Sequence, residues 1–224
     1  MSRDFQLPGR SPIIAGESMA ATSHPLASLA AIDTLRAGGN AADAAVTAVA
    51  VLCVVEPHMT GIGGDCFAMV SVPGKPVWGY NGSGRAGARV SLEALMAQGI
   101  RTIASDSVHA VTVPGAIDAW AAILAAHGRF SLDRVLAPAI RYAAGGFPVA
   151  SRIASDWAQM VAKLRADIGA ARHYLFDGCA PKEGDIVKLP ALAQSLATIA
   201  AKGPRAFYEG PIAQDMVATV AGRG

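Results

Sequence analysis

One stretch decides the fold: residues 38–65, which read GGNAADAAVTAVAVLCVVEPHMTGIGGD. After two helix-ending glycines, Asn40 is placed to cap a new helix, and Asp43 in its first turn suits the positive end of that helix. From residue 44 to residue 55 nearly every side chain is apolar. A helix that is apolar all round belongs in the interior, between two layers. Pro57 stops it.

The residues that follow predict a β-hairpin. Residues 66–72 and 77–80 are typical of two short strands, and Pro73-Gly74 between them is typical of a turn. Residues 81–84, Asn-Gly-Ser-Gly, are predicted to form a second, flexible turn that leads to Arg85.

Most of the remaining chain is predicted to be helical. A first helix begins at Pro25, after Ser23 or His24 as its cap, and carries one apolar stripe. The stripe consists of Leu26, Leu29, Ile32 and Leu35. Further helices are expected at 92–98, 115–126, 132–144, 149–166, 190–201 and 212–221, with a brief strand at 110–113.

Composition and charge exclude several classes of function. The 224 residues are 52% hydrophobic and 16% charged, which fits a soluble folded chain of one domain or two small ones. The net charge is +2, and no basic run forms the stripe that nucleic-acid phosphates require. The most apolar run, residues 41–55, is shorter than the ~20 residues of a membrane span. Residues 1–10 lack the apolar core of a signal peptide, so we expect a cytoplasmic protein with no membrane or nucleic-acid partner.

The glycine loop at 60–65 could in principle hold a phosphate, because glycines let backbone N–H groups approach a ligand and adopt positive φ. However, it lacks the third spaced glycine of the dinucleotide pattern and the Lys-Ser/Thr ending of the P-loop, and it enters a strand. A tight structural turn is the expected alternative. No cofactor is expected.

A metal site is not expected either. The three cysteines are Cys53, Cys66 and Cys179, and none of them forms a close pair of the zinc-binding kind. Cys53, His58 and Cys66 could meet around a metal, but buried apolar thiols are the expected alternative. The histidines are far apart in the sequence, and no Ser-His-Asp arrangement can be assigned to them.

Arg85 is the main candidate for substrate binding, with Ser83 on the same turn as the second. An arginine held just after a glycine-rich turn can offer its planar fork to a carboxylate in two parallel hydrogen bonds. The alternative is a solvated arginine at the end of a hairpin. Arg89 is a weaker competitor for the same role.

Six segments, in order, resemble the gamma-glutamyltranspeptidase family. They cover essentially all of the chain from about residue 19 onward. They are MAATSHPLAS (19–28), GGNAADAA (38–45), VVEPHMTGIGGD (54–65), VTVPG (111–115), LAPAIRYA (136–143) and GFPV (146–149).

This resemblance implies an α+β fold: an N-terminal-nucleophile hydrolase-like αββα sandwich, of which this chain supplies mostly helices and part of a sheet. Residues 1–224 would be the N-terminal portion of the large subunit of a self-cleaving precursor. The nucleophile would be the N-terminal threonine of the small subunit, activated by its own amine, so that no residue of this chain is expected to be the nucleophile. The partners implied are a gamma-glutamyl donor such as glutathione, water or an amino-acid acceptor, the remainder of the large subunit, and the small subunit.

The sequence departs from the family at the arginine that binds the donor's α-carboxylate. That arginine usually lies in an acidic-aromatic-Arg-Glu stretch, whereas residues 81–87 read NGSGRAG, so that Arg85 is displaced by about two residues and the acid is absent. This departure leaves open an acylase with another acyl donor, such as glutaryl. A second alternative, independent of the arginine, is a truncated or degenerate, non-catalytic homologue that acts only as a scaffold or binding module.

The same resemblance has two consequences for the isolated chain. We expect it to be inactive alone. We also expect an open sheet edge and exposed apolar surface, because its partner segments lie outside these residues.

Overall fold

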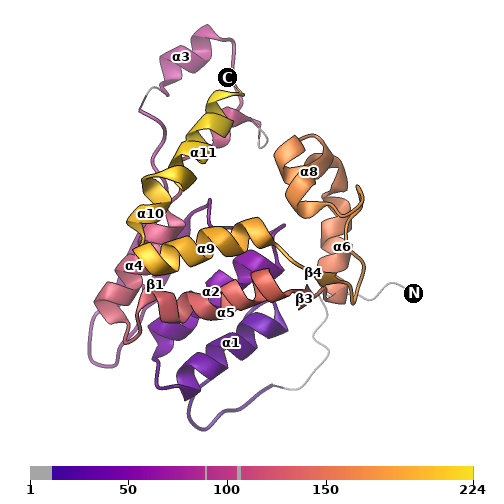
Figure 1. Ribbon diagram of the computed structural model, residues 1–224. Coiled ribbons are helices and arrows are strands. Elements are labelled where there is room, and N and C mark those ends of the chain that lie inside the picture. Colours follow the sequence, from indigo (N-terminus) through magenta and orange to yellow (C-terminus); the bar gives the residue numbers. More distant parts are fainter. Residues whose placement is uncertain (1–11, 89, 105–106, 224) are drawn as a thin grey trace.

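The computed structural model describes residues 12–88, 90–104 and 107–223, and these are mainly helical (Figure 1). No helix within these ranges is long and apolar enough to cross a membrane. The helices are α1 (Pro25–Arg36), α2 (Ala41–Val55), α3 (Leu92–Ala97), the 3-10 helix η1 (Val108–Ala110), α4 (Ala116–His127), α5 (Leu132–Gly145), α6 (Ser151–Gln159), α7 (Val161–Arg165), α8 (Ile168–Tyr174), α9 (Pro190–Lys202), α10 (Arg205–Tyr208) and α11 (Pro211–Ala221). The strands are β1 (Cys66–Val70), β2 (Trp78–Gly82), β3 (Phe147–Pro148) and β4 (Ile186–Val187).

Helix α2 lies inside a stack of helices in the order α1, α2, α5, α9 (Figure 1). Eleven of its 15 residues are buried, including Val51, Val54 and Val55 with no exposed surface. The prediction of an interior helix is confirmed. The physical reason is that an all-round apolar helix gains from burial on each side, and here α1 and α5 supply two of those sides.

The buried face of α1 is not the leucine stripe that its sequence displays. Leu29 is 49% exposed, and Leu26 and Leu35 are only partly buried. The buried residues are Ala27, Ala30, Ala31 and Thr34. Small side chains let two helix backbones approach closely, and Thr34 Oγ1 donates to Thr47 Oγ1 of α2 at 3.2 Å. The N-terminal cap is His24, whose Nδ1 accepts from Leu26 N at 3.1 Å.

The start of α2 is tied to the loop between α4 and α5. The Asp43 side chain is fully buried, and its carboxylate accepts from the backbone N–H groups of Asn40 (2.8 Å), Arg129 (2.9 Å) and Phe130 (3.0 Å). Asn40 Nδ2 donates to the His127 carbonyl at 2.6 Å. Asn40 and Asp43 together form the predicted cap, and the same two residues also hold a distant loop.

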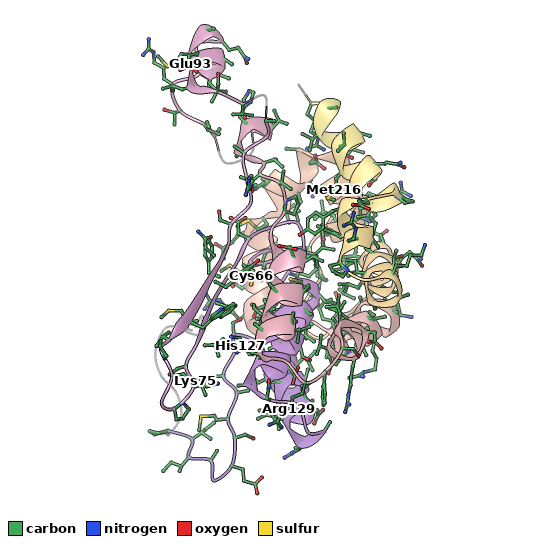
Figure 2. All side chains as sticks on the ribbon, turned by 90° about the vertical axis from the view of Figure 1, so that its left-hand side faces the viewer. Cys66, Lys75, Glu93, His127, Arg129 and Met216 are labelled. Carbon is green, nitrogen blue, oxygen red and sulfur yellow. The ribbon has the colours of Figure 1, made fainter. Side chains whose placement is uncertain are left out.

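The predicted hairpin is confirmed: β1 and β2 pair antiparallel, from Cys66 opposite Gly82 to Val70 opposite Trp78. Strand β2 continues through residues 81 and 82, so the flexible turn predicted at 81–84 begins later than expected. Figure 2 shows the hairpin lying along α4, with Cys66 at one end and Lys75 at its tip. On the other face, Phe67 is 68% exposed and Met69 is 83% exposed. Within the described ranges the sheet has two strands, so both of its edges are open.

Two predictions for the rest of the chain are wrong, and one pair of strands was missed. Residues 149–166 form two helices, because the chain turns at Met160 and brings α8 back against α6, where Trp157 Nε1 donates to the Tyr174 carbonyl at 2.9 Å. The strand expected at 110–113 is absent, and η1 precedes extended chain there. Strands β3 and β4 were not predicted, since they pair across more than thirty residues of helix and turn.

Candidate functional site

The glycine loop, the end of β2 and the start of α4 meet at one place, which we call the glycine junction. It consists of residues 61–65, 82–85 and 112–116. The Gly64 carbonyl accepts from the N–H groups of both Gly115 and Ala116, each at 3.0 Å. These donors belong to the first turn of α4, where N–H groups have no partner within the helix. The glycine loop therefore supplies the hydrogen-bond acceptor for these N–H groups at the start of α4.

Two glycines make this close approach possible. A Cβ atom on Gly84 would overlap the Val113 carbonyl oxygen, and one on Gly115 would overlap the Gly82 carbonyl oxygen. Because both obstructing atoms are backbone atoms, they cannot move aside as a flexible side chain could. The three segments can pack this tightly only with glycine at these positions.

The glycine loop forms a structural turn. Gly64 N donates to the Gly61 carbonyl at 3.3 Å. None of Gly61, Gly63 and Gly64 adopts the positive φ that glycine allows. The N–H groups that a phosphate would need at the start of α4 are already bonded to Gly64.

Arg85 and Ser83 lie together on the exposed rim of the junction. Both residues are exposed. The Arg85 backbone is fixed, because its carbonyl accepts from Val113 N at 2.9 Å, and Ser83 N donates to Asn81 Oδ1 at 3.0 Å. The Arg85 guanidinium has no hydrogen bond or ion pair with any described residue. Its five N–H donors are thus available to an incoming carboxylate. Arg89, the competitor, lies outside the described residues.

Sequence reasoning missed Asp65. Its carboxylate oxygen Oδ1 accepts from Gly84 N, one residue before Arg85, at 2.8 Å. The signal was present in the sequence, as an acidic residue between a glycine loop and a strand. Only the pairing of the two strands shows which N–H group it reaches.

Two of the three residues considered as metal ligands contact other side chains. Cys53 Sγ lies 3.8 Å from Thr60 Oγ1, and His58 Nε2 lies 3.6 Å from Asp156 Oδ2. Among residues 12–88, 90–104 and 107–223, no group of three His, Cys, Asp or Glu side chains could hold a metal ion.

Burial raises the pKa of the Cys53 thiol to about 12. The thiolate is the form of cysteine that reacts. At mildly alkaline pH, the fraction of Cys53 present as thiolate is roughly a thousandfold lower than for an ordinary cysteine with a pKa of about 8.5. Iodoacetamide is therefore expected to modify the exposed Cys179 first and to leave Cys53 unmodified until the chain is unfolded. Peptide mass spectrometry with and without urea measures this. Equal labelling of Cys53 and Cys179 in the folded chain would contradict the prediction.

A cavity of about 890 Å³ lies elsewhere, between the loop after α2, helices α6 to α8 and the end of α11. Among its lining residues are His58, Trp157, Lys163, Tyr174 and Arg223. Neither Ser83 nor Arg85 lines it. The two candidate residues therefore lie on an exposed rim outside this cavity.

Comparison with known proteins gives a consistent result. The family model described as Gamma-glutamyltranspeptidase matches residues 27–224. The chain is 41% identical to the glutathione hydrolase-like YwrD proenzyme of Bacillus subtilis over 95% of its own length and 40% of the relative's. It thus spans about two fifths of that relative.

Two crystal structures have the same fold over nearly all of this chain. Gamma-glutamyltranspeptidase from Helicobacter pylori superposes with a TM-score of 0.88 at 26% identity, covering 93% of this chain and 61% of that one. Cephalosporin acylase from Bacillus halodurans superposes with a TM-score of 0.83 at 36% identity, covering 94% and 42%. The α+β fold class expected from the sequence is confirmed.

Proposed function

The chain belongs to the gamma-glutamyltranspeptidase family, and from this we propose that it is part of an acyltransferase or hydrolase that cleaves gamma-glutamyl amides such as glutathione. The observation that carries the proposal is the Arg85 guanidinium, exposed and free of partners among the described residues, on a rim whose backbone is fixed. A planar guanidinium in this state suits bidentate recognition of a carboxylate.

The reacting group comes from outside these residues in this proposal. The small subunit of the same precursor supplies an N-terminal threonine, whose hydroxyl attacks the amide carbonyl while its own α-amine accepts the proton. The amine of the donor leaves, and the acyl group passes from the threonine to water or to an acceptor amino group. Arg85 contributes by holding the donor's carboxylate, with Ser83 beside it.

The β1–β2 hairpin supports the proposal that other segments of the precursor complete the fold. A two-stranded hairpin is marginally stable by itself, and Phe67 and Met69 expose apolar area on its outer face. We infer that residues 1–224 are the N-terminal portion of the large subunit. The remainder of that subunit and the small subunit are then the partners that cover this face.

Arg85→Ala in the complete enzyme is expected to raise KM for a gamma-glutamyl anilide by about tenfold or more, with a smaller effect on kcat. A hydrogen bond to a charged group contributes roughly 1.5–3 kcal/mol. The contact between Arg85 and the donor's carboxylate is proposed to bind the substrate, so its loss raises KM more than it lowers kcat. Steady-state kinetics measure both constants. The matched control is Arg36→Ala on α1, whose side chain is 76% exposed. An unchanged KM in Arg85→Ala would mean that Arg85 is a solvated surface residue.

A second candidate function is acylase activity on a donor without an α-amino group, such as a glutaryl amide. The 36% identity to cephalosporin acylase favours it, as does the missing acidic residue beside Arg85. The ratio of kcat/KM for glutaryl and gamma-glutamyl anilides separates the two. A higher value for the glutaryl compound would select the acylase.

A further inference from the structure

The pairing of β1 with β2 leaves one backbone N–H group without its expected partner. In the observed register Cys66 lies opposite Gly82, so the next pair of the same orientation would place Gly64 opposite Gly84. The Gly64 carbonyl is turned away from β2, however, because it accepts from Gly115 and Ala116 at the start of α4. Continued pairing cannot therefore provide an acceptor for Gly84 N.

Asp65 takes the place of that acceptor. Its Oδ1 atom accepts from Gly84 N at 2.8 Å, and so a side chain replaces the next rung of the ladder. This hydrogen bond fixes the peptide immediately before Arg85.

The Arg85 backbone is thus held on both sides. Asp65 holds the N–H group of the preceding residue, and Val113 N holds the Arg85 carbonyl. Gly84 cannot take a larger side chain without overlapping Val113, so the path of the chain through this point has little freedom. A fixed backbone determines where the long Arg85 side chain starts and which directions its rotamers reach.

We infer that Asp65 is a positioning residue that aims Arg85 at the carboxylate of the acyl donor. This inference rests on the proposed function. Asp65 acts through Arg85 and does not touch the donor, and it matters as a hydrogen-bond acceptor and not as a charge. The family resemblance gave no role to Asp65. The role proposed for it rests on its bond to Gly84, two residues after the end of β2.

The test is a double-mutant cycle in the complete, processed enzyme, with Asp65→Ala, Arg85→Ala and the two together. Asp65→Ala is expected to raise KM for a gamma-glutamyl anilide by roughly threefold to tenfold, the equivalent of one hydrogen bond, with kcat changed less than twofold. In the Arg85→Ala background, Asp65→Ala is expected to have no further effect on KM, because the arginine side chain that Asp65 positions is absent.

Asp65→Asn is the conservative variant, since its amide oxygen can still accept from Gly84 N. It is expected to restore KM to within about twofold of the unmodified enzyme. Asp33→Ala, a change at an exposed aspartate of α1, serves as the matched control for the removal of a surface charge. Circular dichroism of each variant shows whether it is folded. If Asp65→Ala does not fold, a raised KM in folded Asp65→Asn would still overturn the inference.

The outcomes separate this inference from the proposed function. If Arg85→Ala leaves KM unchanged, the proposed function fails. If Arg85→Ala raises KM but Asp65→Ala does not, the proposed function stands and the positioning role is wrong. If folded Asp65→Asn and Asp65→Ala raise KM equally, the charge of Asp65 contacts the donor, and the inference is also overturned.

Discussion

The polypeptide of residues 1–224, assayed alone, is expected to release no product from a gamma-glutamyl anilide. In the proposed mechanism the attacking hydroxyl and its base belong to a threonine at the start of the small subunit, and Arg85 and Ser83 only bind. Removing a nucleophile abolishes the covalent route entirely, so this is the largest effect expected for the protein. Activity is expected to appear when the complete precursor is produced and processed.

Two controls make this result interpretable. The complete precursor with its small-subunit threonine changed to alanine should be as inactive as the 224-residue chain. Intact mass measurement of the unmodified precursor should show two subunits. Turnover by residues 1–224 alone would contradict the proposal, whereas a complete natural product without a threonine-led subunit would favour the scaffold alternative.

Asp43→Asn is expected to lower the free energy of unfolding by about 3 kcal/mol. The carboxylate is fully buried and accepts from three backbone N–H groups, one at the start of α2 and two in the loop before α5. An amide in its place turns an NH₂ group toward at least one of these donors. A buried donor left without an acceptor costs roughly 1–3 kcal/mol, and the loss of a charge-assisted bond adds to this.

Urea unfolding followed by circular dichroism measures the change. Asp33→Asn on α1 is the matched control, because the same chemical change occurs there on a side chain that is 60% exposed. It is expected to change the free energy of unfolding by less than about 0.5 kcal/mol. If both variants unfold at the same urea concentration, Asp43 does not anchor the loop as described.

Part of the candidate site could be predicted from the sequence and part could not. Arg85 was recognised because an arginine after a glycine-rich turn is a local pattern, and the structure places it on an exposed rim beside Ser83. Asp65 was missed because its partner, Gly84, is 19 residues away and lies opposite the loop only once β1 and β2 pair. The same pairing extended β2 into the turn that was expected at 81–84.

The sequence by itself determined features that depend on neighbouring residues: the all-apolar helix α2 with its Asn40 cap, the β1–β2 hairpin, and the family through six ordered segments. Only the tertiary structure decided which face of α1 is buried, that Asp43 reaches a loop 86 residues further on, and that β3 pairs with β4. The physical reason is the range of the interactions. Helix caps and turns are set by a few adjacent side chains, whereas a buried face or a bond between distant segments exists only after packing brings its partners together.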